Sequence, residues 1–160
     1  MTSACVCGKR LVRGLLTAAT VVLLGLSVSA RDEERVNRSR NGLALKGYDP
    51  VLYFTEARAA QGSASFEYEY QTARYRFVNA ANRDLFAADP GRYVPQYGGF
   101  CAYAVSRGYT ADVDPEAWAI VNGKLYLNYS KRVRGLWQED VPGNIRKADA
   151  NWPQLRKTNK

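Results

Sequence analysis

The stretch AWAIVNGKLYLN, residues 117–128, decides the fold class of this chain. Asn-Gly between two runs rich in apolar residues is the strongest short signal for a β-hairpin, because both residues of such a turn need a positive φ. Centring the turn on Asn122-Gly123 predicts four cross-strand pairs: Ile120 with Leu125, Trp118 with Leu127, Ala119 with Tyr126, and Ala117 with Asn128. The first two pairs share a face that we expect to be buried, whereas Tyr126 lies on the opposite face and need not be core.

A second hairpin is predicted upstream. Residues 66–70, FEYEY, and residues 74–77, RYRF, alternate with the period of half-buried strands. The predicted pairs are Tyr70 with Tyr75, Glu69 with Arg76, and Tyr68 with Phe77. One face of this hairpin is then aromatic and buried, and the other is a row of opposite charges.

The segments around the hairpins carry helix signals. A first helix is predicted over residues 80–88, with Asn79 as its cap and Leu85 and Phe86 facing inward. A second is predicted over residues 100–107 and is closed by Gly108. Two more follow, one capped by Ser130 and a last one stopped by Pro153. Residues 51–54, VLYF, follow a turn and are predicted to form a short strand. Because hairpins and helices are segregated, we predict an α+β fold, a small single domain of β-hairpins packed with helices.

The first thirty residues have the pattern of a secretory signal peptide. Lys9, Arg10 and Arg13 precede a short apolar run, residues 15–28, and small residues follow up to Ala30. Residues 1–30 are therefore predicted to be a signal peptide, which makes the protein periplasmic or secreted, with no membrane segment in its mature form. The rest is expected to comprise a flexible leader over residues 31–42, a domain over residues 43–155 and a C-terminal tail over residues 156–160.

Composition excludes several function classes. The 160 residues include no histidine, which rules out a Ser-His-Asp triad, a Cys-His dyad and any His-ligated metal site. The formal net charge of +8 falls by three with the signal peptide, and the remaining basic excess is scattered and forms no stripe interleaved with aromatics, so no nucleic-acid partner is predicted. Cys5 and Cys7 also leave with the signal peptide, which makes Cys101 the single thiol of the mature chain.

Motifs along the mature chain resemble those of the YHS domain. They are GYDPV at residues 47–51, YRF at 75–77, NRDLFAADPGRY at 82–93, YGGFCAY at 97–103, DPEAW at 114–118, NGKLYLNY at 122–129 and ADANWP at 148–153. The later motifs are similar to those of an exported, longer branch of this family. The resemblance covers nearly all of the chain after Gly42 and implies a YHS-like core followed by a C-terminal hairpin and helices.

The sequence departs from metal-binding YHS domains at the three positions where those relatives carry cysteines. These positions hold Leu52, Val78 and Asn82, so the metal site of the relatives is not predicted here, and no cofactor is predicted either. Some members of the longer branch have selenocysteine at the position of Cys101. The resemblance therefore implies a chemical role for the sulfur, and Cys101 is the candidate catalytic residue.

Two interpretations of Cys101 stay open from the residues alone. A free cysteine is often a small buried hydrophobe, and Cys101 shares a predicted helix face with Ala104 and Val105. Alternatively, Gly98-Gly99 turns the chain so that the sulfur lies in the first helical turn, where amide donors stabilise a thiolate. The tyrosines that either line a pocket near the sulfur or serve only in packing are Tyr48, Tyr97, Tyr103 and Tyr126. Asp49 is expected to be a turn residue.

Three functions remain open. A thiol redox protein acting through Cys101 needs an external small thiol as partner, since the mature chain has no second cysteine. A non-enzymatic module that binds a soft metal ion or a small ligand is the alternative, although a single thiolate is a poor metal site. A structural domain with an inert cysteine is the third. The sequence does not decide whether the protein is an enzyme.

Overall fold

The computed structural model describes residues 1–2 and 35–157. The predicted signal peptide, apart from its first two residues, lies outside the described residues, as do residues 31–34 of the predicted leader and residues 158–160 of the predicted tail. The elements that follow belong to one compact unit.

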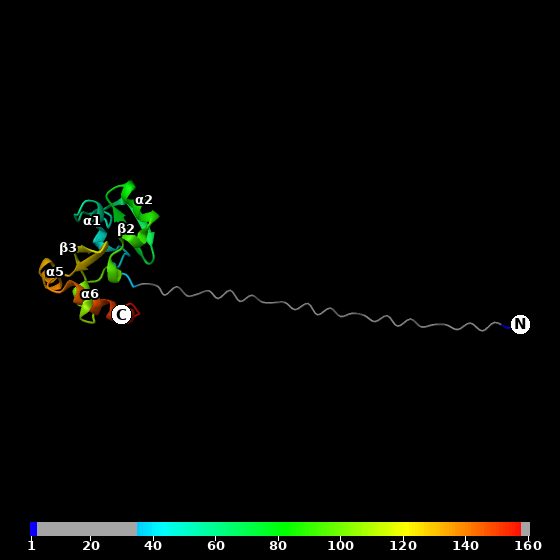
Figure 1. The fold of residues 1–160 in the computed structure, drawn as a ribbon. Helices are drawn as coiled ribbons and strands as arrows, with labels where there is room; N and C mark the ends of the chain where they lie inside the picture. Colours follow the sequence, from blue (N-terminus) through cyan, green and yellow to red (C-terminus); the bar gives the residue numbers. More distant parts are fainter. Residues whose placement is uncertain (3–34, 158–160) are drawn as a thin grey trace. The chain divides into compact units, whose positions relative to one another are not determined.

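The chain folds into two antiparallel hairpins and a set of short helices, which confirms the α+β fold class. In chain order the elements are η1 (Leu45–Gly47), α1 (Leu52–Thr55), β1 (Ser63–Tyr70), β2 (Ala73–Phe77), α2 (Ala80–Ala88), α3 (Pro90–Tyr93), η2 (Gln96–Gly99), α4 (Ala102–Ser106), β3 (Asp114–Val121), β4 (Lys124–Asn128), α5 (Lys131–Gln138) and α6 (Val141–Leu155). Helix α2 packs beside the β1–β2 hairpin, and α5 packs beside β3 (Figure 1).

The β3–β4 hairpin forms at the predicted turn. Asn122 and Gly123 have φ values of 50° and 71°, and three of the four predicted pairs are present, from Trp118–Leu127 to Ile120–Leu125. The fourth is wrong, because an irregularity between Asp114 and Trp118 places Asp114 opposite Asn128. The register near the turn follows from local turn chemistry, whereas a bulge further along β3 cannot be read from alternation.

Both faces of the β3–β4 hairpin are buried, and each belongs to a different hydrophobic core. The first core contains Leu125 and Leu127 together with residues from Ala44 to Val113. The second core comprises Tyr97, Ala102, Val105, Tyr126, Trp137 and Ala148. The expectation that Tyr126 need not be core was therefore wrong, since it is 4% exposed. Its ring packs 5.3 Å from that of Trp137, which comes from α5 and covers this face.

The β1–β2 hairpin is shifted by two residues from the predicted register. Its turn has only two residues, Gln71 and Thr72, and the observed pairs are Glu67 with Arg76, Tyr68 with Tyr75, Glu69 with Arg74, and Tyr70 with Ala73. A shift of two residues keeps every side chain on its face. The aromatic face therefore stays buried, and the ring centres of Phe86 and Tyr75 lie 4.8 Å apart.

Residues 51–54, predicted as a strand, instead form the start of the short helix α1, so that prediction was wrong. The Asp49 carboxylate accepts the Val51 N–H at 2.9 Å, and Pro50 has a φ suited to a helix start. The Tyr53 hydroxyl then donates to the Pro115 carbonyl at 3.0 Å and anchors the turn to β3. These tertiary contacts outweigh the β propensity of Val, Tyr and Phe.

Helix α2 begins as predicted, with the Asn79 side chain accepting the Asn82 N–H at 2.8 Å. Phe86 is completely buried, but Leu85 is 48% exposed, so its predicted inward position was wrong. Neighbouring residues on a helix lie about 100° apart, and this short helix buries only a narrow stripe.

The C-terminal helices also differ in part from the prediction. Ser130 caps α5 by accepting the Val133 N–H at 3.2 Å, as predicted. Pro153, however, does not stop α6, which continues to Leu155. Proline at this position removes one hydrogen bond to the preceding turn, but the helix closes beyond it, where the Arg156 N–H donates to the Trp152 carbonyl at 2.9 Å. Helix α4 is shorter than predicted, with Gly108 after it at a φ of 86°.

Residues 35–42, expected within a flexible leader, are docked on the domain; we call them the docked segment. The Asn37 N–H donates to the Gly98 carbonyl at 2.8 Å, and the Arg35 side chain donates to the Leu155 carbonyl at 3.0 Å. A Cβ on Gly98 would lie 1.9 Å from the Arg35 carbonyl oxygen, so this turn needs glycine. The described part of the predicted leader therefore contacts the domain in this structure.

Candidate functional site

Cys101 is a free cysteine at the junction of η2 and α4, and it is only 1% exposed. It is the residue that precedes α4, not a member of its first turn as the sequence suggested. Its backbone N–H donates to the Ala111 carbonyl at 3.0 Å, and its carbonyl accepts the Val105 N–H at 2.9 Å. The backbone is therefore fixed from both sides, and the side chain lies in the first core.

The sulfur has one hydrogen-bond donor and one acceptor beside it. The Tyr129 N–H donates to Sγ at 3.3 Å, and the thiol donates to Asn128 Oδ1 at 3.8 Å. The same oxygen accepts the Tyr103 N–H at 3.3 Å. Because a backbone N–H can only donate, this contact fixes which end of the Asn128 amide faces the sulfur. The arrangement suits a protonated thiol, which donates and accepts at once.

The Asn128 side chain is fully buried, and its Nδ2 has no hydrogen-bond partner among the residues described. The Oδ1 atom cannot be exchanged for Nδ2 without setting a donor against the Tyr103 N–H. Asn128 therefore keeps its acceptor toward Cys101 at the cost of one unpaired donor. From sequence, Asn128 was predicted only as the partner of Ala117 in a strand pair.

The sulfur forms part of the wall of a pocket of about 290 Å³, which we call the Cys101 pocket. It is lined by Cys101, Tyr103, Ala104, Tyr109, Ala111, Tyr129 and Val133. Tyr109 and Tyr129 are 54% and 60% exposed, so they stand at its mouth. None of these lining residues carries a formal charge at neutral pH. The site is thus a small aromatic hollow with a thiol in its wall.

Only one of the four tyrosines predicted near the sulfur reaches this pocket, namely Tyr103. Tyr97 and Tyr126 belong to the second core, and Tyr48 lines a separate hollow of about 540 Å³ that shares Tyr129 with the Cys101 pocket. Sequence reasoning missed Tyr109 and Tyr129. Tyr109 lies in the turn after α4, and Tyr129 directly follows β4. This position just beyond a helix or strand was the only signal that the sequence offered for them.

Tyr97 and Tyr126 are better explained by packing. The Tyr97 hydroxyl donates to Asp149 Oδ1 at 2.9 Å. Burial raises the pKa of Tyr97, and its hydrogen bond to Asp149 raises that pKa further. Burial, followed by the negative charge of Asp149, also raises the pKa of Tyr126. Both hydroxyls stay protonated at neutral pH, and the Tyr97 hydroxyl ties α6 to the second core through Asp149.

Asp49 is a fully buried carboxylate and does not line the Cys101 pocket. Its Oδ1 accepts the Val51 N–H, and its Oδ2 accepts the Val78 N–H and the Asn82 side chain, each within 2.9 Å. Val78 and Asn82 are two of the positions at which the predicted resemblance would place the cysteines of metal-binding YHS domains. Here they are hydrogen-bond donors to a carboxylate, and within the described residues no three His, Cys, Asp or Glu side chains gather as a metal site.

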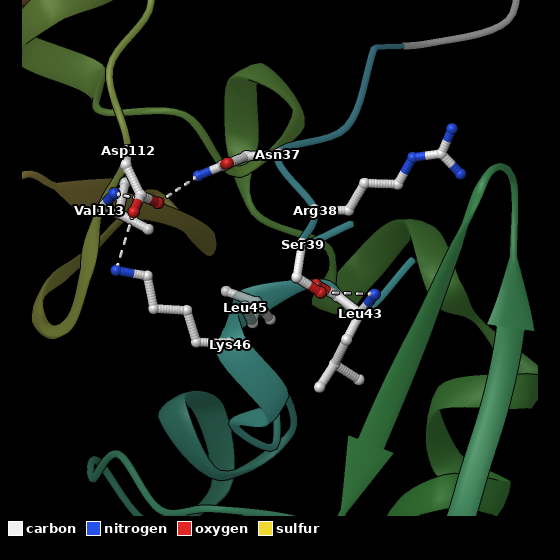
Figure 2. Close-up of a pocket in the computed structure, with 8 residues that line it drawn as sticks. All are labelled: Asn37, Arg38, Ser39, Leu43, Leu45, Lys46, Asp112 and Val113. Carbon is white, nitrogen blue, oxygen red and sulfur yellow. Dashed lines mark hydrogen bonds and ion pairs between the residues drawn. The ribbon is translucent and has the colours of Figure 1, made fainter. Parts of the chain in front are cut away.

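A second small hollow, of about 160 Å³, lies where the docked segment meets η1 and the loop before β3 (Figure 2). Lys46 Nζ is 2.9 Å from Asp112 Oδ2, and Asn37 Nδ2 donates to Asp112 Oδ1 at 3.1 Å. Burial alone would raise the pKa of Asp112, but the hydrogen bonds from Lys46, the Val113 N–H and Asn37 outweigh it and lower that pKa. The polar groups of this hollow, Asn37, Lys46 and Asp112, already bind one another across the contact between two segments. The Cys101 pocket is therefore the better candidate site.

Comparison with known proteins identifies no relative. No family model matches the chain, and no curated protein or solved structure matches it. The resemblance to YHS domains therefore remains a prediction from sequence motifs, and the function must be inferred from the site.

Proposed function

We propose that this protein is an exported, YHS-like binding module that holds a small organic molecule in the Cys101 pocket, with the reduced thiol in the pocket wall. The observation that carries the proposal is the position of the sulfur: it borders a defined hollow although the residue is 1% exposed. Ligand pockets commonly have volumes of about 300–1,000 Å³, so a hollow of about 290 Å³ suits a small ligand.

The pocket chemistry favours an organic body over a metal ion. Three tyrosine rings offer faces for stacking, and the polarisable sulfur makes favourable contacts with aromatic groups. A soft metal ion would need at least a second soft ligand, and the chain has neither histidine nor a methionine other than Met1. The soft-metal alternative is therefore disfavoured.

Thiol redox chemistry is the second candidate, favoured by the opening of the pocket onto the sulfur. In that cycle a peroxide would oxidise the thiol to a sulfenic acid and leave as water or an alcohol. An external thiol would then form a mixed disulfide and release water, and a second would restore Cys101. We rank this function below binding because the lone pairs of Asn128 Oδ1 face the sulfur and oppose a thiolate, which the Tyr129 N–H alone would stabilise.

The kinetics of thiol modification, in which the reagent transfers a methylthio group to the sulfur and releases methanesulfinate, test the proposal. The full chain is treated with a small neutral thiol reagent, methyl methanethiosulfonate, and modification of the Cys101 peptide is followed by mass spectrometry. We expect Cys101 to react in the folded protein, faster than global unfolding allows, and to be protected by a bound ligand.

A matched pair of variants makes the experiment specific to the pocket. Val133→Phe fills the pocket from α5 and should slow the reaction at least tenfold, whereas Leu136→Phe, on an exposed position of the same helix, should leave it unchanged. Reaction only at the rate of global unfolding would show an inert packing cysteine. Rapid accumulation of sulfenic acid with dilute peroxide, without ligand protection, would favour the redox candidate instead.

A further inference from the structure

One cation beside the Cys101 pocket, Arg107, has no counter-ion among the residues that the structure describes. Arg107 Nη2 donates to the Tyr103 hydroxyl at 2.8 Å, and its guanidinium carbon lies 4.9 Å from the centre of the Tyr103 ring. Tyr103 is a wall of the pocket, so the charge of Arg107 lies one side chain away from the cavity. In the part of the chain that the structure describes, no ion pair of Arg107 is found.

A helix cap does not account for this placement. Arg107 follows α4, and a cation near a helix C-terminus is mildly stabilising. That role needs the charge near the last carbonyls, and it does not need the side chain to fold back over Tyr103. The Tyr103 oxygen accepts from Arg107, so its own O–H is left to donate. Guanidinium and hydroxyl together form a donor pair that matches a carboxylate.

The charges around the pocket point the same way. Exposed Lys131 and Arg132 lie in sequence between the lining residues Tyr129 and Val133. The carboxylate next to lining residue Ala111 is Asp112, which is already bound by Lys46 and Asn37. The residues next in sequence to these lining positions therefore add more positive than unpaired negative charge beside a cavity whose walls are aromatic and aliphatic.

We infer that the Cys101 pocket takes a small aromatic carboxylate, with its ring among Tyr103, Tyr109 and Tyr129 and its carboxylate on Arg107 and the Tyr103 hydroxyl. This inference rests on the proposed function and adds the chemical class of the ligand. Aromatic rings stack on tyrosine, whereas the guanidinium supplies a charge-assisted hydrogen bond that a neutral ligand cannot use fully.

Three probes separate the parts of this inference: benzoate, its neutral analogue benzamide, and cyclohexanecarboxylate, an anion without an aromatic ring. Binding to the full chain is measured by NMR shift titration. We expect benzoate to bind at least tenfold more tightly than benzamide, which is about 1.4 kcal/mol. We also expect it to bind several-fold more tightly than cyclohexanecarboxylate.

Two arginine variants provide the matched comparison. Arg107→Gln should bring the affinity for benzoate to that for benzamide and leave benzamide unchanged. Arg92→Gln, which removes an exposed guanidinium lying 5.5 Å from the Tyr93 ring outside the pocket, should change neither affinity. The benzamide titration also serves as a folding control, because a folded variant must bind benzamide with the affinity of the wild type.

The outcomes separate this inference from the proposed function. Equal affinity for benzoate and benzamide, with both protecting Cys101 from modification by methyl methanethiosulfonate, would overturn the role of Arg107 and leave the binding pocket standing. Equal affinity for benzoate and cyclohexanecarboxylate would overturn the aromatic preference. Two results together would overturn both this inference and the proposed function. They are that no probe binds or protects Cys101, and that Val133→Phe does not slow modification of the thiol.

Discussion

Asp49→Asn should destabilise the protein although it removes no atom from the core. The wild-type carboxylate is completely buried and accepts three hydrogen bonds, from Val51, Val78 and Asn82. An asparagine in the same place has one acceptor oxygen. If that oxygen keeps the bonds to Val78 and Asn82, the new NH₂ group faces the Val51 N–H, and two donors oppose each other.

The expected loss is about 2–4 kcal/mol. A hydrogen bond to a charged group contributes about 1.5–3 kcal/mol, and a buried donor without a partner costs about 1–3 kcal/mol. A partial offset arises because a neutral amide is easier to bury than a carboxylate. Against a typical domain stability of about 5–15 kcal/mol, this loss is a large fraction.

Urea unfolding followed by tryptophan fluorescence measures the effect, with an unchanged m value required for the comparison. The matched control is Asp84→Asn, which removes an exposed carboxylate from a surface ion pair with Arg83 and should cost under about 0.5 kcal/mol. A loss for Asp49→Asn that equals the control would refute the reasoning, since it would show that the three hydrogen bonds are not needed to hold the carboxylate.

Three further predictions follow from the geometry. Gly98→Ala should release the docked segment, seen as faster amide exchange in residues 35–42, whereas Gly108→Ala, with a similar positive φ but open space around it, should leave that exchange unchanged. Cys101→Ser should keep the fold with a loss of about 0.5–2 kcal/mol in thermal unfolding, because a hydroxyl finds the same donor and acceptor; a loss above about 3 kcal/mol would contradict this. Because the pKa of Asp112 is lowered in the folded protein, the Asp112 carboxylate stabilises the fold above its ordinary pKa of 3.8, and this stabilisation is lost as the pH falls below that value. Lys46→Met should therefore flatten the dependence of the urea midpoint on acid pH, and an unchanged slope would argue against the ion pair.

The elements that local chemistry specifies were predictable from sequence. Asn122-Gly123 dictates its turn, and Asn79 and Ser130 carry the side chains that cap their helices. Residues 51–54 were misassigned because Asp49, not their own propensity, selects the helical turn. The predicted β1–β2 register was wrong by two residues because Gln71 adopts a left-handed φ of 52°, a conformation that a glutamine in the sequence does not indicate.

The candidate site was only half predictable. Cys101 was identified because it is a lone thiol in a family-like motif. The walls of its pocket come from separate parts of the chain, including Ala111 before β3 and Val133 on α5, and no local pattern joins them. Tyr109 and Tyr129 resemble ordinary surface tyrosines until the fold places them together.

The β3–β4 hairpin has a consequence for synthesis of the chain on the ribosome. The first core needs residues up to Leu127, and the second needs residues up to Ala148. Phe86 of α2 covers the aromatic face of the β1–β2 hairpin soon after that hairpin is made, but the first core stays incomplete until Leu127 emerges, about forty residues later. At about 5–20 residues per second, that interval lasts seconds, long enough for a holding chaperone to bind. Once Leu127 emerges, closure of the first core presents a preformed wall on which the second core can assemble.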